Sequence, residues 1–302
     1  MKKRRLAELS LILVTLGWGV SYYLMDISLT EMGPFTLNAY RFLIAFAVAA
    51  ILSFRLIKDV NKETIKYSFF LGTLLLFVYS GATFGVKHTT LSNAGFLCAL
   101  AVVITPFIET VFLKKPLPAK VQISAVACLI GIMLMTLKDD FSINMDHLPG
   151  DLLCIMCALS YAFHILVTQK AVKQDDVNSF QLGVFQLFFC GAYCLIMGFI
   201  FETPAVPSNW RVGGSVLFLA IFCTGVAFIV QSVAQKFTEA SRVGIIFSLE
   251  PVFAGIVAYF FAGEILTVKG YIGVTIMILA ILFLETDFNF LKVKNKGIES
   301  EI

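Results

Sequence analysis

Residues 212–237 read VGGSVLFLAIFCTGVAFIVQSVAQKF, a stretch of 26 residues in which the only charged side chain is Lys236. A helix of about 20 apolar residues is long enough to cross the hydrocarbon core of a bilayer. This stretch therefore predicts a membrane-spanning helix. Runs of the same kind recur along the whole chain, so the fold class depends on how many there are and how they are connected.

Ten apolar runs are separated by short connections that carry charges, Gly, Pro or Asn. The runs are 6–28, 34–56, 65–86, 92–113, 120–137, 151–171, 180–201, 212–237, 241–262 and 269–285. The longest connection, about 138–150, leaves no room for a further domain. A transmembrane β-barrel would instead show alternating strands of about 10 residues. We therefore predict an all-α polytopic membrane protein with ten transmembrane helices.

The amino-acid composition is typical of a chain that is embedded in a lipid bilayer. Hydrophobic residues make up 59% of the 302 residues, charged residues only 14%, and 30 residues are Phe. Soluble domains are about 45–50% apolar and 25% charged, so a soluble enzyme, a disordered chain and a nucleic-acid binder are excluded. All seven Cys lie in apolar runs, and no second Cys or His pair accompanies Cys154-x-x-Cys157. The sequence predicts no metal ion and no cofactor.

Lys and Arg are distributed unevenly between alternate connections. One side of the predicted membrane carries 18 of them, beginning with KKRR at residues 2–5, and the other side carries four. Because Lys and Arg accumulate in cytoplasmic loops, this asymmetry predicts that both termini are cytoplasmic. The first run is too long for a signal peptide and ends without a cleavage site, so we expect an uncleaved helix in the cytoplasmic membrane.

The two halves of the chain resemble each other at an offset of 145 residues. Phe35-Thr-Leu-Asn-Ala-Tyr-Arg41-Phe aligns with Phe180-Gln-Leu-Gly-Val-Phe-Gln186-Leu, and Pro106 aligns with Pro251. Each half contains five predicted spans. Because five is an odd number, the second half crosses the membrane in the opposite orientation to the first. We therefore predict two inverted five-helix repeats, at 6–137 and 150–286, followed by a cytoplasmic tail at 287–302. Inverted repeats are common in secondary transporters.

Several segments give the chain a specific family resemblance. They include Leu16-Gly-Trp18-Gly-Val-Ser-Tyr22, Tyr40-Arg41-Phe, and the stretch from Thr238 to Ala254 with Glu250-Pro251 inside it. In these the chain resembles the drug/metabolite transporter superfamily, in its EamA-type branch of ten-helix permeases. The resemblance implies transport of small metabolites, often amino acids, by alternating access without ATP. It also implies a central cavity lined by helices 1, 3, 4, 6, 8 and 9, with helices 5 and 10 at the periphery.

Ionisable residues inside predicted spans are costly and mark functional sites by default, and three of them lie well within their spans. Arg41 could clamp a substrate carboxylate or tie its helix to a neighbour, and we favour the structural role because its repeat counterpart is Gln186. Glu250 could bind a cation, carry a proton or hydrogen-bond a neighbouring helix. We do not expect it to pair with Arg242 within one helix, since eight residues separate them. His164 could contact substrate or simply pack.

The remaining candidates form two groups. Pro106 and Pro251 predict repeat-related helix breaks at a hinge or gate, and we place Arg41, Gln186 and Arg242 with them as gating or structural residues. Aromatic walls with few polar groups suit a small amphipathic ligand. The expected substrate-binding residues are Trp18, Ser21, Tyr22, Tyr79, Thr83, Asn93, Tyr161, His164, Thr224, Phe228, Gln231, Ser248 and Glu250.

Three functional classes remain open at this point. The sequence favours a secondary transporter for a small metabolite, such as an amino acid or a related amphipathic compound. The alternatives are a polytopic membrane enzyme, although no His-Glu-x-x-His or Gly-x-Ser-x-Gly motif occurs, and a membrane scaffold or receptor. We expect the bilayer and a small molecule as partners, a coupling proton as a further candidate, no nucleic acid, and a monomer rather than an oligomer.

Overall fold

A computed structural model describes residues 2–89, 97–113, 116–136, 147–262 and 267–285, and within these ranges it contains helices and no strand. The helices of the first half are α1 (Lys2–Leu29), α2 (Pro34–Leu52), α3 (Phe54–Ile57), α4 (Lys62–His88), α6 (Ala101–Leu113) and α7 (Ala119–Thr136). Those of the second half are α8 (Leu148–Val172), α9 (Ser179–Phe201), α10 (Trp210–Ala220), η2 (Ile221–Val226), α11 (Ala227–Ala234), α12 (Ala240–Phe247), α13 (Glu250–Val257), η3 (Ala258–Ala262) and α14 (Val268–Glu285).

Seven helices in the described ranges are long and apolar enough to cross a membrane, and three shorter apolar helices accompany them. The expectation of an all-helical polytopic membrane protein is therefore confirmed. Several predicted spans are interrupted. Span 34–56 is divided between α2 and α3, 212–237 contains the π-helical turn η2, and 241–262 is divided into α12, α13 and η3. The predicted span 92–113 is described only from residue 97, because 90–96 lie outside the described residues.

Asparagine side chains begin three of the long helices. Asn61, Asn178 and Asn209 each accept hydrogen bonds from backbone N–H groups in the first turns of α4, α9 and α10. Asn is a preferred N-cap residue because its side-chain oxygen satisfies donors that have no partner within the helix. α2 begins at Pro34, which needs no hydrogen-bond acceptor at the first helical position. The short polar connections therefore set where the spans start.

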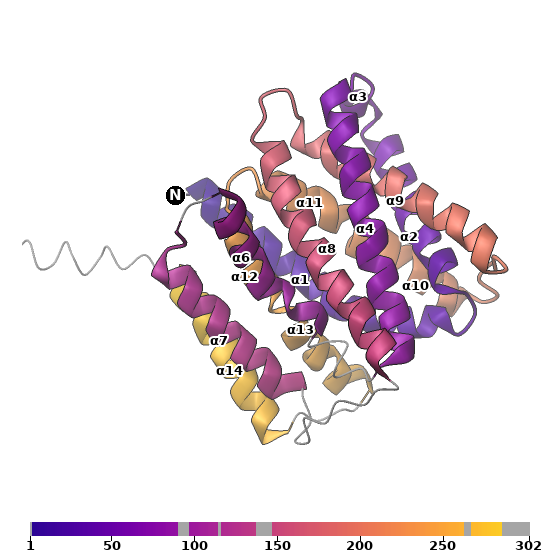
Figure 1. Ribbon diagram of the computed structural model, residues 1–302. Helices are drawn as coiled ribbons and strands as arrows, with labels where there is room; N and C mark the ends of the chain where they lie inside the picture. Colours follow the sequence, from indigo (N-terminus) through magenta and orange to yellow (C-terminus); the bar gives the residue numbers. More distant parts are fainter. Residues whose placement is uncertain (1, 90–96, 114–115, 137–146, 263–266, 286–302) are drawn as a thin grey trace, which may run out of the picture.

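The helices pack in pairs that bring the two halves of the chain together (Figure 1). α4 lies along α8, α2 along α9, and α7 along α14, and the α7–α14 pair stands at one edge of the bundle. Gly81 permits the α4–α8 contact, because a Cβ atom there would lie 2.6 Å from the backbone oxygen of Leu153. Small residues allow helices to approach closely in a membrane. Gly81 and Gly85 therefore serve the packing of α4 on α8, where a Cβ atom at Gly85 would meet the side chain of Cys154.

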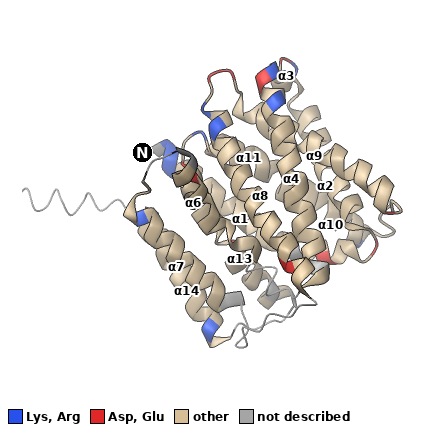
Figure 2. Cartoon of the chain, viewed as in Figure 1, with Lys and Arg blue, Asp and Glu red and all other residues tan. Residues whose placement is uncertain are grey.

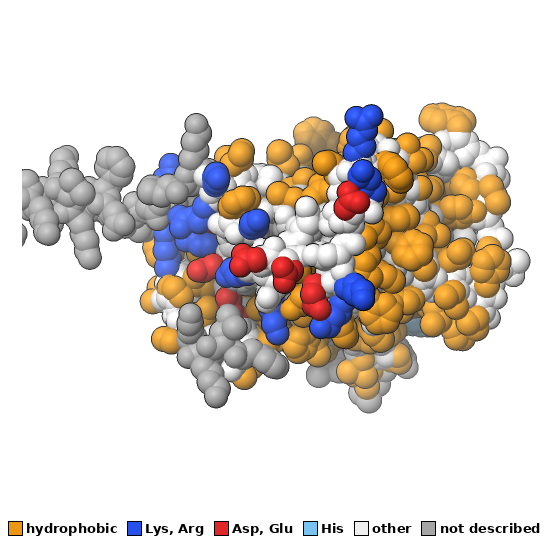
Figure 3. All heavy atoms as spheres, turned by 90° about the horizontal axis from the view of Figure 1, so that it is seen from above, with side chains coloured by type: hydrophobic (Ala, Val, Ile, Leu, Met, Phe, Trp, Pro, Cys, Tyr) orange, Lys and Arg blue, Asp and Glu red, His pale blue; other side chains and the backbone are white. Residues whose placement is uncertain are grey.

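Charged side chains collect at the two ends of the bundle. Most Lys and Arg lie at the end that carries the N-terminus and α3 (Figure 2). Seen from that end, charged side chains cross the middle of the molecule and hydrophobic side chains cover its flanks (Figure 3). Large hydrophobic side chains that are exposed include Phe199, Trp210 and Leu279. Apolar flanks between two charged ends are the surface that a bilayer-spanning bundle presents. We call the end with the N-terminus the basic end.

At the opposite end of the bundle, two acidic residues form hydrogen bonds between connecting segments. The carboxylate of Glu202, just after α9, accepts hydrogen bonds of 2.8 Å from the backbone N–H groups of Phe35 and Thr36 at the start of α2. Glu31 accepts hydrogen bonds from the backbone N–H (2.8 Å) and the hydroxyl (2.7 Å) of Ser208. These hydrogen bonds, the backbone one above all, stabilise the carboxylate and lower the pKa of Glu31.

Candidate functional site

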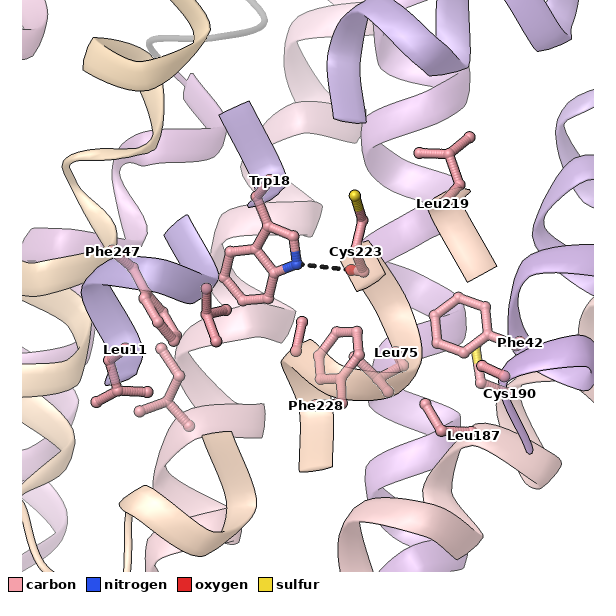
Figure 4. Close-up of a cluster of buried hydrophobic side chains, with 14 of the residues drawn as sticks. Leu11, Trp18, Phe42, Leu75, Leu187, Cys190, Leu219, Cys223, Phe228 and Phe247 are labelled. Atoms are coloured by element: carbon pink, nitrogen blue, oxygen red, sulfur yellow. Dashed lines mark hydrogen bonds between the residues drawn. The ribbon is translucent and has the colours of Figure 1, made fainter. Parts of the chain in front are cut away.

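Aromatic side chains from both halves of the chain meet in the middle of the bundle. Six helices contribute to this aromatic cluster, which we define as Trp18, Phe42, Tyr79, Tyr161, His164, Phe228 and Phe247. The Trp18 ring centroid lies 4.8 Å from that of Phe247, 5.8 Å from Phe228 and 5.9 Å from Tyr161. Figure 4 shows Trp18, Phe228 and Phe247 facing one another. The cluster provides an aromatic wall near the positions of the predicted site.

Trp18 is held by the π-helical turn η2. Its indole Nε1 donates a hydrogen bond of 2.9 Å to the backbone oxygen of Cys223, drawn as a dashed line in Figure 4. The thiol of Cys223 in turn approaches the backbone oxygen of Gly17 at 3.2 Å. π-helical turns within α-helices occur frequently at functional sites because they widen the helix locally. The orientation of the Trp18 ring therefore depends on a turn in the second half of the chain.

Arg41 lies beside the cluster and is almost completely buried. Its Nε donates to the hydroxyl of Thr224 at 3.2 Å, and its Nη1 approaches the sulfur of Met25 at 3.0 Å. The guanidinium carbon stands 5.0 Å from the ring centroid of Tyr79, at cation–π distance. Thr224 precedes Phe228 by one helical turn. The structure therefore brings a cation of α2 to the edge of the aromatic wall.

Gln186, which the predicted repeat aligns with Arg41, takes part in a network of uncharged side chains. Gln186 accepts a hydrogen bond of 2.8 Å from Nε2 of the buried His164, and its Nε2 donates to the hydroxyl of Ser232 at 3.1 Å. A neutral imidazole that donates from Nε2 presents Nδ1 as an acceptor. No described group bonds His164 Nδ1, the Tyr161 hydroxyl or the Gln231 Oε1, although all three atoms are buried.

Buried polar atoms without partners are costly and call for an explanation. His164, Tyr161 and Gln231 are three of the predicted substrate-binding residues, and the rings of His164 and Tyr161 stack at 5.8 Å. Gln231 Nε2 donates one hydrogen bond of 3.1 Å to Gln235 Oε1, whereas its own Oε1 has no partner among the described residues. Together these residues offer hydrogen-bonding groups next to aromatic rings, which is the usual lining of a small-molecule site.

A second cluster of polar side chains closes the basic end around the start of α12. Glu8 of α1, with a side chain only 2% exposed, forms ion pairs with Arg242 at 3.3 Å and with Arg4 at 3.6 Å. Its Oε1 also accepts a hydrogen bond of 3.1 Å from the Thr238 hydroxyl. Arg242 therefore forms an ion pair with a carboxylate on another helix.

Two further helices hold the first turn of α12. Glu109 of α6 accepts hydrogen bonds from the backbone N–H and the hydroxyl of Ser241, and Gln169 of α8 accepts one of 2.9 Å from the backbone N–H of Ala240. A carboxylate near a helix N-terminus also interacts favourably with the helix dipole. We call Glu8, Glu109 and Gln169 the α12 clamp, because they join α1, α6 and α8 to one helix end.

The two prolines behave differently. α12 ends at Phe247 and α13 begins at Glu250, so the helix breaks directly before Pro251, as expected. α6 continues through Pro106, and the turn in this segment lies earlier, at Leu100. The expectation of a helix break at Pro106 is therefore not met. A proline inside a helix removes one hydrogen bond but can be accommodated within a bundle of neighbouring helices.

The other predicted residues occupy varied positions. The hydroxyls of Ser21, Thr83 and Ser248 bond backbone oxygens of their own helices, at 2.7, 2.5 and 2.6 Å. Glu250 is partly buried at the start of α13. Asn93 lies outside the described residues, as does the side chain of Tyr22. Ring contacts thus join the aromatic candidates Trp18, Tyr161 and Phe228 with His164.

Several residues of these clusters were not among the sequence candidates, including Glu109 and Gln169 of the α12 clamp. Phe42 and Phe247 belong to the aromatic cluster, but thirty Phe in the chain give no signal that would select these two. Glu8 gives a weak signal in the sequence because it stands close to the charged segment at residues 2–5. The signal that could have found it is the spacing of four residues from Arg4, which places both side chains on one helix face.

The sequence profile of the EamA-like transporter family matches residues 5–137 and 148–286. The chain belongs to this family. An "uncharacterized transporter" of Archaeoglobus fulgidus is 30% identical over 281 residues, covering 93% of this chain and 86% of the relative. The "uncharacterized transporter YoaV" of Bacillus subtilis is 23% identical and covers 95% and 98%. The resemblance to the drug/metabolite transporter superfamily is thereby confirmed.

A solved crystal structure shares the fold of this EamA-like protein. The TM-score is 0.78 at 17% sequence identity, and the match covers 92% of this chain and 96% of the other. At this identity the likeness concerns the fold alone. Family membership and the names of the relatives identify a multi-pass membrane transporter and give no support to an enzyme.

Proposed function

We propose that this EamA-like protein is a secondary transporter that moves a small metabolite, an amino acid or a related amphipathic compound, across the cytoplasmic membrane by alternating access. The observation that carries the proposal is the set of buried, unpartnered acceptor and hydroxyl groups of Tyr161, His164 and Gln231 beside the aromatic cluster. These groups lack partners within the described structure, and a bound substrate would supply them.

The arrangement of the halves supports alternating access. If 6–137 and 150–286 are inverted repeats, counterpart helices should contact each other, and α2 does pack on α9, α6 on α12, and α7 on α14. The span formed by α10, η2 and α11 is the counterpart of α4, and α8 is the counterpart of α1. The contact of α1 with that span therefore corresponds to the contact of α4 with α8. Two repeats that exchange conformations would open the site to each side in turn.

The α12 clamp supports a state that is closed at one end. Glu8, Glu109 and Gln169 join three helices to the start of α12 at the basic end, through hydrogen bonds that separation of these helices would break. In our proposal the basic end is cytoplasmic, both termini are cytoplasmic, and the monomer is the transporting unit. The break before Pro251 supplies a hinge within the same span as the clamp.

Transport by the purified full-length chain in liposomes tests the proposal. Labelled amino acids, amphipathic amines and nucleosides are offered with and without a pH gradient, and protein-free liposomes give the background. We expect at least one compound to enter by saturable transport, and Phe228→Ala to abolish its transport. Phe199→Ala, a change of the same size on the exposed flank of α9, should retain it. Absence of protein-dependent uptake, or equal loss in both variants, would overturn the proposal.

Orientation is tested separately on the intact cell. A reporter fused to the C-terminus should report the cytoplasm, and a tag placed in the connection 138–150 should react with an impermeant reagent from outside, because the Lys and Arg bias directs the basic end inward. Protection of that tag from the outside would refute the proposed orientation, while leaving the transport result unaffected.

A further inference from the structure

None of the described groups that contact the positively charged side chain of Arg41 carries a negative charge. The residue is only 1% exposed, in the interior of α2. Its contacts are the hydroxyl of Thr224, the sulfur of Met25 and the face of Tyr79, all of which are neutral. Among the residues that the structure describes, no carboxylate forms an ion pair with Arg41; the recorded ion pairs join other cations.

Such a site is energetically unusual. Guanidinium stays protonated in proteins, so it cannot escape burial by losing its charge. Removing a charge from water costs several kcal/mol, and buried charges are therefore normally paired with an opposite charge. A hydroxyl and a thioether each accept a hydrogen bond, but neither supplies a negative charge, and the thioether is a weak acceptor.

Helix packing alone does not account for the charge. The repeat-related residue Gln186 is neutral, fully buried, and joins α9 to α8 and α11 through His164 and Ser232. A neutral side chain is therefore sufficient to connect helices at the counterpart position. The feature of Arg41 that needs a separate explanation is its positive charge.

The position of Arg41 suggests what provides the missing negative charge. The guanidinium adjoins the aromatic cluster through Tyr79, whose ring lies 4.8 Å from Phe42 and 6.2 Å from Phe228. It also adjoins η2 through Thr224, in the same turn that orients Trp18. A ligand seated against the aromatic rings could therefore extend an anionic group to Arg41.

We propose that Arg41 is the anion-binding residue of the transport site, so that the substrate carries a carboxylate at one end and an apolar group that packs on the aromatic cluster. The inference rests on the proposed transport function and adds the charge of the substrate. The planar guanidinium matches a carboxylate in two-point geometry, which a lysine ammonium does not. Binding of the substrate would then also neutralise the buried cation.

Matched ligand pairs test this inference by fluorescence. Trp18 and Trp210 are the only two tryptophans, and Trp210 is 89% exposed, so Trp210→Phe leaves Trp18 as a single reporter inside the cluster. The probes are phenylalanine and its amide, leucine and its amide, and 3-phenylpropionate and its amide. Within each pair the apolar group is constant and only the carboxylate is lost. The measured quantity is the ratio of the two dissociation constants.

We expect the acid to bind about 10- to 100-fold more tightly than its amide in at least one pair, the range of a charge-assisted hydrogen bond. Arg41→Gln should bring that ratio close to one, chiefly by weakening the acid, and Arg41→Lys should leave it intermediate. Arg211→Gln, the same substitution at an exposed position of α10, should leave it unchanged. A structural role for Arg41 would alter both members of a pair equally.

The outcomes separate this inference from the proposed function. If acids and amides bind but their ratio is the same with and without Arg41, or if amides bind more tightly, the anion-binding role is refuted and the transport proposal stands. If none of the six probes changes Trp18 emission while an amine or a nucleoside is transported, the anion-binding role is refuted and the transport function stands. If no compound of either set is transported, the transport function fails together with the inference. Thermal unfolding of each variant, measured on the same preparations, verifies that the comparison uses folded protein.

Discussion

Weakening the ion pair between Glu8 and Arg242 should reveal a strong coupling between α1 and α12. Glu8→Gln preserves the size of the side chain and a hydrogen bond to Thr238, but removes the negative charge that Arg4 and Arg242 share. Arg242, whose side chain is only 13% exposed, would then lose the charge of the Glu8 carboxylate. The expected loss of stability is about 3 kcal/mol, as found when one partner of a buried pair is removed.

The coupling energy can be bounded from the geometry. At the observed 3.3 Å, two unit charges attract by about 5 kcal/mol in an effective dielectric of about 20. Desolvation of Glu8 offsets much of this attraction, because its side chain is only 2% exposed. Arg4 contributes less, since a third of its side chain is exposed. A double-mutant cycle of Glu8→Gln and Arg242→Gln should therefore give about 1–3 kcal/mol.

The assay is reversible unfolding of the four purified proteins in mixed micelles. An internal comparison comes from Glu63 and Lys66, which stand at a similar distance of 3.4 Å but are 50% and 62% exposed. Their cycle should give below about 0.5 kcal/mol, as exposed pairs usually do. A Glu8–Arg242 coupling as small as that of the exposed pair would refute the reasoning that burial makes this contact strong.

Three further predictions follow from other parts of the structure. Pro251→Ala should join α12 to α13 and slow transport more than it lowers stability, whereas Pro106→Ala should affect transport less because α6 already continues through it; equal effects would contradict the hinge. Glu250→Gln should abolish transport driven by a pH gradient while exchange at equal pH survives, if Glu250 carries a coupling proton; full activity in the driven assay would remove it from the mechanism. The pKa of Glu31 is lowered from 4.5, so its hydrogen bonds to Ser208 stabilise the fold above that pH and are lost as the pH falls through the lowered value. The thermal midpoint should therefore fall more steeply in acid for the wild type than for Glu31→Gln, and parallel curves would exclude this contribution.

The membrane fold could be predicted from local sequence alone. Whether a run such as 212–237 enters a bilayer depends on its own length and apolarity, because a solvated charge would have to lose its water and an apolar residue would not. The break at Pro251 is equally local, since proline lacks the N–H that a continuous helix needs. Pro106 shows the limit of that rule: neighbouring helices allowed α6 to continue through the same residue type.

The partners of the buried polar residues required the tertiary structure. Arg242 and Glu8 are separated by 234 positions, and Arg41 and Thr224 by 183, so no periodicity connects them. The sequence suggested Trp18, Tyr161 and His164 as site residues, but only the packing of six helices decided that they share one cluster with Phe42 and Phe247. Hydrophobic burial is non-directional and is determined by composition, whereas the pairing of polar groups depends on distances that only the packed bundle sets.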